Sequence, residues 1–287
     1  MTSSPQVKRF DWGNLRLRIL SGVILAPAVF AVVWIGEGPL LMMTAVATAL
    51  LAIEWGKMST PEAPGRTAAL VSVAVLAPLF FAYRADTALA VLLLPLTGVT
   101  AALAARMTEW SRRSLDITFG VIYIGFPGLL FLWIRHGSGG LGWAATMLGA
   151  TWTADIVAFI AGNVFKGPKL WPQISPNKTW SGFYFGLLGA VIAAMIVAYS
   201  GFLDGGPGRE LAAPVGLAVG LATMAGDLWE SILKRRFGVK DSGDLIPGHG
   251  GLLDRVDGLM FAIVVAAGLR LALSAHASPV FHATLSR

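Results

Sequence analysis

The segment from Ser231 to Asp257 is the densest group of residue types that could do chemistry in this chain. It contains four carboxylates, five cations and one histidine: Asp241, Asp244, Asp254, Asp257, Lys234, Arg235, Arg236, Lys240, Arg255 and His249. Cytoplasmic loops of membrane proteins collect Lys and Arg, which fix their orientation. That rule does not explain carboxylates among the cations, or the glycine-rich turn at 247–251 that leads into Asp254. We therefore predict a metal and phosphate site at a membrane surface.

Four polar residues around the start of this segment share one face of a predicted helix. Asp227, Glu230, Ser231 and Lys234 stand at spacings i, i+3, i+4 and i+7, which places them on a single stripe. One interpretation is an ion pair between Glu230 and Lys234, worth roughly 0.2–0.5 kcal/mol at an exposed site. That pair leaves Asp227 without a structural explanation.

A second helix is expected to begin near Leu252. Asp254 and Asp257 then fall in its first turns, where Asp227 could meet them across the helix pair. Mg²⁺ typically binds one or two protein carboxylates and completes its shell with water and substrate phosphate, so this group predicts a magnesium site. A second cation stays open. The helix start and the Gly250–Gly251 pair also favour close approach of backbone N–H groups to a phosphate.

Two further carboxylates lie inside other apolar runs, and a charge in hydrocarbon is costly enough to need a reason. Glu54 stands near the inner end of its run, and we interpret it as extending toward water beside Lys57. Asp155 stands well inside a later run. It is either a structural carboxylate bonded to a neighbouring helix or a group of the site, and a functional role is favoured at least equally.

The composition is that of a polytopic membrane protein. Of 287 residues, 55% are hydrophobic and 13% are charged, against about 25% charged in soluble domains. The chain has no cysteine, which leaves Asp, Glu and His as the strong side-chain metal ligands. Membrane topology and anionic lipid explain its net charge of +6. No nucleic-acid partner is therefore expected.

Apolar runs of about 20 residues can cross the hydrocarbon core as helices, and nine occur here. They are Leu17–Ile35, Leu40–Gly56, Thr67–Tyr83, Thr87–Ala105, Ile117–Ile134, Gly142–Val164, Gly182–Gly201, Ala213–Leu233 and Val256–Ala275. With a cytoplasmic N-terminus, 17 Lys and Arg residues face the cytoplasm and five face outside, a strong positive-inside asymmetry. The first run follows several cations and has no persuasive cleavage site, which predicts an uncleaved anchor. The predicted fold class is an all-α polytopic helical bundle of about nine transmembrane helices with the N-terminus in the cytoplasm.

We divide the chain into an N-terminal transmembrane region, residues 1–135, with about five spans, and a catalytic transmembrane region, residues 136–287, with about four. The loop 166–179 in the second region carries three lysines, three prolines and no acid. Considered alone it is a rigid connector, at the same face as the polar segment. The glycine pairs Gly182–Gly186 and Gly216–Gly220 permit close helix contacts without establishing a dimer.

The polar segment resembles the signature of a known family. The matching positions are Ser231, Lys234, Arg235, Lys240, Asp241, Pro247, His249, Gly250, Gly251, Asp254, Arg255 and Asp257, with Gly226 and Asp227 upstream. The stretch Ser175–Thr179 (SPNKT) resembles the family's S-P-x-K-T segment, and the group around Asp155 (Ala158, Phe159 and Gly162) resembles its intramembrane aspartate motif. The family often has Tyr at the position of Phe159, so this chain lacks that hydroxyl. In these features the chain is similar to phosphatidate cytidylyltransferases, also called CDP-diacylglycerol synthases.

The resemblance covers the second half of the chain, and the first five spans match only as hydrophobic helices. It implies that CTP and phosphatidic acid react with Mg²⁺ to give CDP-diacylglycerol and pyrophosphate, at the cytoplasmic side of a bacterial-type inner membrane. The implied catalytic residues are Asp227, Lys234, Arg235, Asp241, His249, Asp254, Arg255 and Asp257. The implied metal ligands are Asp227, Asp254 and Asp257, and the implied phosphate-binding residues are Ser175, Lys178, Lys234, Arg235, Lys240, His249 and Arg255. The expected partners are CTP, phosphatidic acid and membrane lipid, and a homodimer is left open.

His249 is expected to donate a hydrogen bond to phosphate or to order its loop. A phosphate monoester has a second pKa of about 6 and is already largely dianionic at neutral pH. The attacking oxygen therefore needs little help from a general base.

Two other functional classes are alternatives. CDP-alcohol phosphotransferases also use membrane-edge aspartates, and the sequence 254–258 (DRVDG) echoes the opening of their motif. That motif continues with two further aspartates, whereas no acidic residue follows Asp257. A transporter would explain carboxylates within spans, yet it gives no reason for the long pattern of acids and bases at one face. Transport into vesicles and pyrophosphate release in detergent distinguish these classes.

Overall fold

The computed structural model describes residues 12–107, 114–203, 205–243, 245 and 250–276. Within these ranges the chain forms nine helices and one short hairpin. The helices are α1 (Trp12–Ile35), α2 (Glu37–Ser59), α3 (Pro64–Tyr83), α4 (Thr87–Met107), α5 (Ser114–Arg135), α6 (Gly140–Phe165), α7 (Trp180–Tyr199), α8 (Ala212–Arg236) and α9 (Leu253–His276). The hairpin strands β1 (Lys169–Trp171) and β2 (Ser175–Thr179) connect α6 to α7 and pair antiparallel. The predicted helical bundle is confirmed, with the hairpin as its one addition in the described chain.

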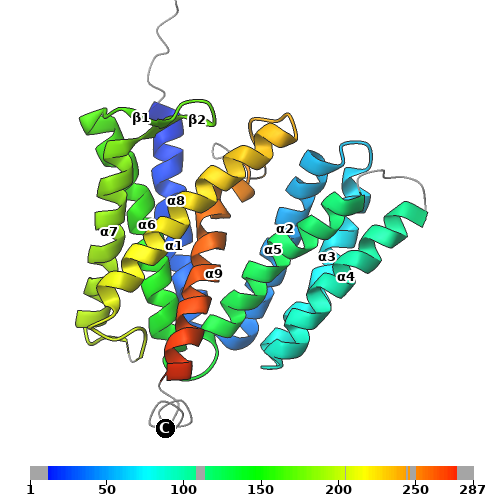
Figure 1. Ribbon diagram of the computed structural model, residues 1–287, viewed down its shortest axis with the longest axis horizontal. Coiled ribbons are helices and arrows are strands. Elements are labelled where there is room, and N and C mark those ends of the chain that lie inside the picture. Colours follow the sequence, from blue (N-terminus) through cyan, green and yellow to red (C-terminus); the bar gives the residue numbers. More distant parts are fainter. Residues whose placement is uncertain (1–11, 108–113, 204, 244, 246–249, 277–287) are drawn as a thin grey trace, which may run out of the picture.

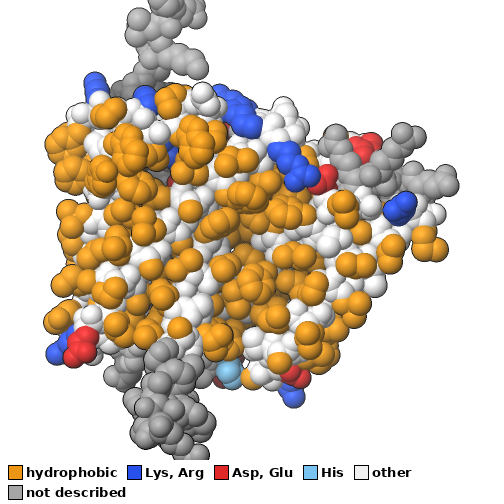
Figure 2. All heavy atoms as spheres, in the orientation of Figure 1, with side chains coloured by type: hydrophobic (Ala, Val, Ile, Leu, Met, Phe, Trp, Pro, Cys, Tyr) orange, Lys and Arg blue, Asp and Glu red, His pale blue; other side chains and the backbone are white. Residues whose placement is uncertain are grey.

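Helices α2 to α9 are each long and apolar enough to cross a membrane, which gives eight such helices in the described ranges. The first predicted span lies within α1, where the segment Ile24–Ile35 counts as a shorter apolar helix. Hydrophobic side chains cover the middle of the molecule, and Lys and Arg gather toward its two ends (Figure 2). A helix satisfies its own backbone hydrogen bonds in lipid, so this arrangement suits a bilayer. The chain is a polytopic membrane protein.

The helices form two neighbouring groups (Figure 1). Helices α2 to α5 pack on one another in one group, and α6 to α9 pack on one another in the second. Helix α5 joins them, because it contacts α6 and α9 as well as α2. One buried apolar cluster runs through both groups and includes Trp55, Leu129, Leu148 and Leu253. The division into two functional regions at residue 135 stays a prediction.

Small residues bring the helices of the second group close together. A Cβ added at Gly182 would lie 2.8 Å from the backbone oxygen of Ala158 in α6. One added at Gly216 would lie 2.7 Å from the Cβ of Ala194 in α7. Gly186 and Gly220 make similar close approaches to α6 and α7. Both predicted glycine pairs are thus used for contacts within the chain.

Part of the predicted polar loop is helical. Helix α8 continues to Arg236, so Lys234 and Arg235 lie in its last turn. Helix α9 begins at Leu253 and has Asp254 in its first turn. Cations at a helix C-terminus and anions at an N-terminus oppose the helix dipole. The charges of this segment therefore stabilise the end of α8 and the start of α9.

Candidate active site

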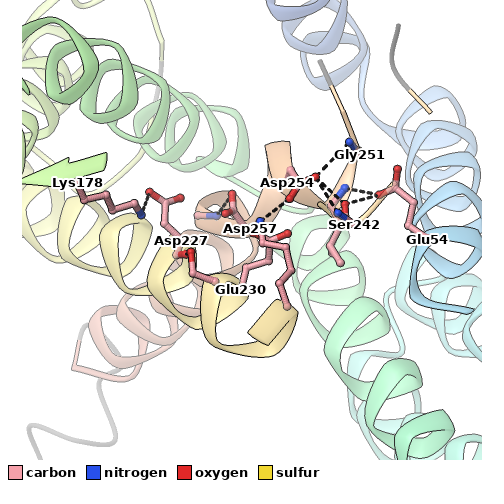
Figure 3. A network of polar contacts seen from close by, with 12 residues as sticks. Glu54, Lys178, Asp227, Glu230, Ser242, Gly251, Asp254 and Asp257 are labelled. Atoms are coloured by element: carbon pink, nitrogen blue, oxygen red, sulfur yellow. Dashed lines mark hydrogen bonds and ion pairs between the residues drawn. The ribbon is translucent and has the colours of Figure 1, made fainter. Parts of the chain in front are cut away.

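The crossing of α8 and α9 sets the centre of the site. A Cβ added at Gly226 would lie 2.4 Å from the backbone oxygen of Asp257, and one at Gly258 would lie 3.0 Å from Oδ1 of Asp227. Only glycine permits so close an approach of two backbones. Figure 3 shows the outcome, with Asp227 and Asp257 side by side. The predicted meeting of carboxylates from two helices therefore occurs at this pair.

A cavity of about 910 Å³ opens beside this crossing, bounded by α6, the hairpin, α7, α8 and α9. Its polar lining consists of Asp155, Asn163, Lys166, Lys169, Asn177, Lys178, Thr179, Asp227, Glu230, Ser231, Lys234, Asp254, Arg255 and Asp257. Phe159, Phe183 and Met224 contribute to its apolar wall. The side chain of Phe159 is also 65% exposed, so the wall reaches the outer surface of the bundle. One space thus offers both charged groups and an apolar edge.

Two lysines bridge carboxylates in this cavity. Lys178 Nζ lies 2.6 Å from Asp227 Oδ2, which ties the hairpin to α8. Lys234 Nζ lies 2.7 Å from Glu230 Oε2 and 2.5 Å from Asp254 Oδ1, which ties α8 to α9. The side chains of Lys234, Glu230 and Asp254 are 15%, 2% and 15% exposed. The predicted Glu230–Lys234 pair is present, but the expectation of an exposed and weak pair is wrong because the pair is buried.

Asp254 uses both of its carboxylate oxygens within the protein. Its Oδ2 accepts hydrogen bonds from Ser242 N at 3.1 Å, Ser242 Oγ at 2.9 Å and Gly251 N at 3.2 Å. Its Oδ1 accepts from Lys234. Among the described residues, no group of three or more acidic or histidine side chains is arranged to hold a metal. Asp254 therefore orders the chain before α9, whereas Asp227 and Asp257 of the predicted ligand set lie close enough to interact electrostatically.

Glu54 of α2 occupies the N-terminus of α9. The side chain is fully buried, and its two carboxylate oxygens accept hydrogen bonds from Leu252 N and Leu253 N, each at 2.7 Å. The prediction that Glu54 extends toward water beside Lys57 is therefore wrong. Glu54 and Asp254 accept from the backbone N–H groups of 251, 252 and 253, so the predicted approach of this segment to a phosphate stays a prediction for its other N–H groups. Protein carboxylates thus cap three N–H groups at and just before the start of α9.

Comparisons with known proteins identify the family. The family model described as "Cytidylyltransferase family" matches residues 16–272. The chain belongs to this family. A phosphatidate cytidylyltransferase of Pseudomonas aeruginosa is 35% identical over 266 residues, which are 89% of this chain and 96% of the relative. Phosphatidate cytidylyltransferases of Brucella abortus and Staphylococcus epidermidis are 35% and 31% identical and cover 87% of this chain, with 90% and 96% of their own lengths matched.

The cytidylyltransferase match extends over helices α1 to α5, which the sequence reading had treated only as hydrophobic spans. It gives no support to the phosphotransferase and transporter alternatives. The family match therefore includes helices of both groups. Contacts of α2 with the start of α9 already provide one link between them.

The structure brings together most of the residues predicted for the site of this cytidylyltransferase. Seven line the cavity: Asp155, Lys178, Asp227, Lys234, Asp254, Arg255 and Asp257. Asp155 faces the cavity and lies close enough to Asp227 to interact electrostatically. Four others lie outside the lining: Ser175 on β2, and the exposed Arg235, Lys240 and Asp241 at the end of α8 and just after it. His249 lies outside the described residues.

Sequence reasoning missed several residues of this site. Lys166 and Lys169 line the cavity, and the signal was available as a loop with three lysines and no acid. The interpretation of that loop as a plain connector is wrong, since it forms the hairpin that carries Lys178 to Asp227. Tyr123 of α5 has a buried hydroxyl without a partner in the described structure and lies near Glu230 and Asp257. No sequence signal marked Tyr123.

Proposed function

We propose that this chain transfers the cytidylyl group of CTP to phosphatidic acid, which gives CDP-diacylglycerol and releases pyrophosphate. The observation that carries the proposal is the similarity to phosphatidate cytidylyltransferases along 87% to 89% of the chain. The cavity supports it, because cations and carboxylates there stand beside an apolar edge. Such a space suits a nucleoside triphosphate that must meet a lipid phosphate.

The reaction joins two strongly anionic molecules. An oxygen of the phosphatidate phosphate attacks the α-phosphorus of CTP and forms a new P–O bond. The bond from the α-phosphorus to the oxygen shared with the β-phosphorus breaks, and pyrophosphate leaves with the electron pair. Positioning and charge neutralisation supply most of the catalysis of such transfers. The lipid phosphate is already largely dianionic near neutral pH, so no strong general base is needed.

Three lysines of the hairpin segment, together with Arg255, provide the positive charge in this mechanism. Lys166, Lys169 and Lys178 come from one side of the cavity, and Arg255 comes from the start of α9. We assign these four side chains to hold the triphosphate and the lipid phosphate. The apolar edge at Phe159 is assigned to the acyl chains of phosphatidic acid. Arg235, Lys240, Ser175 and His249 stay predicted phosphate contacts.

Mg²⁺ fits the donor pair Asp227 and Asp257. The two carboxylates stand side by side at the helix crossing, and Mg²⁺ commonly takes one or two carboxylates together with water and phosphate oxygens. When bound, Mg²⁺ supplies charge neutralisation at the triphosphate. Asp254 already accepts four hydrogen bonds, so we assign it to positioning and keep ligation as the alternative. A second cation stays a prediction.

We further propose that the chain lies in a bacterial inner membrane and that its site opens to the cytoplasm. CTP is made in the cytoplasm, and the Lys and Arg asymmetry of the loops favours the same side. The bacterial source of the relatives supports a bacterial membrane. A homodimer stays a prediction that the glycine pairs do not support, because these glycines pack inside the chain.

The experiment that tests the proposal is pyrophosphate release by the purified full-length chain in mixed micelles of detergent and phosphatidic acid. We expect release only when CTP, phosphatidic acid and Mg²⁺ are all present, with CDP-diacylglycerol as the lipid product. Asp257→Asn should abolish it, and Glu62→Gln, a change at an exposed carboxylate after α2, should leave it unchanged. No release from a folded protein in both micelles and phosphatidate-containing bilayers would overturn the proposal.

A further inference from the structure

Glu54 has no place in the chemistry described above, yet it is among the most completely buried charged residues of the described chain. It lies in the last two turns of α2, and its relative exposure is 0%. Within the described chain, its carboxylate forms hydrogen bonds with a segment that lies 188 to 199 residues further along. A buried carboxylate is unfavourable unless hydrogen bonds replace its water. These long-range hydrogen bonds therefore compensate for the burial of the Glu54 carboxylate.

The partners of Glu54 are Ser242, Leu252 and Leu253, which together with Gly251 we call the α9 entry. Oε1 accepts from Leu252 N and Oε2 accepts from Leu253 N, each at 2.7 Å. Ser242 Oγ lies 3.3 Å from Oε2. The first N–H groups of a helix have no partner inside it, and a negative charge there also opposes the helix dipole. Glu54 thus acts as an N-terminal cap supplied by a distant helix.

The α9 entry leads directly into the cavity. Ser242 donates from both its backbone N and its Oγ to Asp254 Oδ2. Asp254 Oδ1 in turn accepts from Lys234, which also pairs with Glu230. Figure 3 shows the line of contacts that runs from Glu54 through Ser242 and Asp254 toward Glu230 of α8. A displacement of the α9 entry would therefore move Asp254 and the cation that it holds.

The packing around Glu54 leaves little room for another arrangement. A Cβ added at Gly251 would lie 1.9 Å from Ser242 Oγ and 2.9 Å from Glu54 Oε2. One added at Gly243 would lie 3.1 Å from Glu54 Oε1. Glycine at both positions lets the backbone close over the carboxylate. The α9 entry is thus built around this side chain.

The neighbouring residue fixes the position of Glu54 itself. Trp55 is fully buried, and its Nε1 donates to the backbone oxygen of Asp116 in α5 at 3.0 Å. Its ring meets Phe237, directly after α8, edge to face at 5.5 Å. Glu54 and Trp55 together connect α2 to the beginnings of α5 and α9 and to the end of α8. Helix α2 therefore contacts the start of α5, the start of α9 and the residue directly after α8.

We propose that Glu54 is a positioning residue for nucleotidyl transfer, which holds the α9 entry and through it Asp254 in the arrangement that turnover requires. Glu54 is not among the described residues that line the cavity, so it acts through Ser242 and the backbone. This role rests on the proposed function. It also gives the first group of helices a part in catalysis.

The experiment compares Glu54→Gln with the wild type in the full-length chain. Gln keeps the shape but has one acceptor oxygen, so it leaves Leu252 N or Leu253 N facing an NH₂ group. We expect kcat per folded molecule to fall about 10- to 100-fold, since small misplacements of catalytic groups have effects of this size. KM for CTP should change by less than kcat, because Glu54 does not touch the cavity. Glu62→Gln is the matched control.

A second measurement separates positioning from simple stabilisation. Hydrogen–deuterium exchange of peptides that cover Leu252 and Leu253 should become faster in Glu54→Gln, with little change in α4 or α7. Faster exchange with unchanged kcat would overturn the proposal, because the cap would then be structural only. A fall in kcat without faster exchange at these residues would overturn it as well. Because exchange needs no substrate, an inactive wild type would count against the proposed function and not against the cap.

The pair of Glu54 and Ser242 provides the third measurement. Ser242→Ala removes one hydroxyl of the network and keeps the backbone N–H donors of Glu54, so it serves even where Glu54→Gln does not fold. It should lower kcat per folded molecule on its own. If Glu54 acts through Ser242, the loss in the double variant should be clearly smaller than the product of the two single losses. Independent, multiplying losses would contradict a shared pathway.

Discussion

The two ends of the bundle use charged side chains in different ways. At the end that holds the cavity, Lys178 and Lys234 contact carboxylates that come from other elements, and all of these groups line one space. At the opposite end, Arg135 and Arg270 donate to backbone carbonyls. In the first case the cations pair with carboxylates, and in the second they donate to uncharged backbone oxygens. The first arrangement can exchange partners with an anionic substrate, and the second cannot without opening a helix end.

Arg270 illustrates the structural use of charge. It extends from α9 to the carbonyl oxygens of Trp133, Ile134, His136 and Ser138 at the end of α5 and just beyond. The last carbonyls of a helix have no partner inside it, and a cation there opposes the helix dipole. Arg135 does the same for Val33 and Trp34 at the end of α1. Both arginines are among the five Lys and Arg residues that the predicted topology places outside. Each of them binds carbonyl groups at the end of a neighbouring helix.

Glu54 combines the two uses. It caps the start of a helix, as the arginines cap helix ends, but the helix that it caps carries Asp254 and Asp257 into the cavity. A cap at the functional end therefore has consequences for turnover, whereas a cap at the opposite end should affect stability alone. The following predictions test this distinction, beginning with the largest effect.

Among the substitutions that compare the two ends, Asp227→Asn should cause the greatest loss of activity. It removes a carboxylate of the proposed Mg²⁺ pair and the partner of Lys178, and we expect kcat to fall about 10²- to 10³-fold. Stability should change little, because Lys178 is 27% exposed and can be solvated. The matched control is Asp86→Asn near the opposite end, where the carboxylate accepts from Leu89 N and Asn also caps well. Steady-state pyrophosphate release at several Mg²⁺ concentrations measures both. Equal effects of the two substitutions would remove the distinction between the ends.

Lys234→Met should cause the greatest loss of stability at the cavity end. Glu230 and Asp254 would lose their shared cation while 2% and 15% exposed, and breaking a buried pair costs about 3–5 kcal/mol. Unfolding in detergent, followed by circular dichroism, measures this free energy. Adding Glu230→Gln should recover part of it, because one uncompensated charge is removed. An unchanged midpoint would show that this triad does not hold α8 to α9.

Arg270→Gln tests the opposite end. It removes a cation that donates to four carbonyl groups, and loss of these partly buried and exposed hydrogen bonds from a charged group predicts a destabilisation of about 1–3 kcal/mol. The value of kcat per folded molecule should stay at the wild-type level, since α9 meets the cavity at its other end. Unfolding and turnover are measured on the same preparation. A fall in kcat at full folding would mean that the two ends are coupled through α9.

Local features of the sequence predicted most of the fold. Each span is a run of apolar residues, and the stripe of Asp227, Glu230 and Lys234 follows from helical spacing alone. The approach of Asp227 to Asp257 was expected, because Asp227 lies on the polar stripe of one predicted helix and Asp257 lies in the first turns of the next. These inferences need only neighbours along the chain. The same reasoning singled out Asp155, Asp227, Lys234, Asp254 and Asp257 among the residues that line the cavity, whereas the roles of Lys178 and Arg255 came from the resemblance to the family.

Partners that are far apart along the chain could not be derived in this way. A glutamate near the end of an apolar helix can extend to water or meet buried N–H donors, and both satisfy its charge. For Glu54 the choice depends on Leu252 and Leu253, almost 200 residues away. The pairing of Lys178 with Asp227 likewise depends on the hairpin, whose strands are too short to give a clear alternating pattern. Three-dimensional packing decides these contacts.

Arg236→Gln should have the smallest effect, although Arg236 lies only two residues after Lys234. Its Nη2 lies 2.8 Å from Asp116 Oδ1, but the Arg236 side chain is 57% exposed, against 15% for Lys234. Exposed ion pairs contribute about 1 kcal/mol or less and weaken with added salt. We expect a loss of stability within this limit and an unchanged kcat, measured at low and high ionic strength. Both cations end the same helix and contact a carboxylate of another helix, but Lys234 is more buried and also contacts Glu230. A loss as large as that of Lys234→Met would show that position on α8, and not burial, determines what each charge contributes.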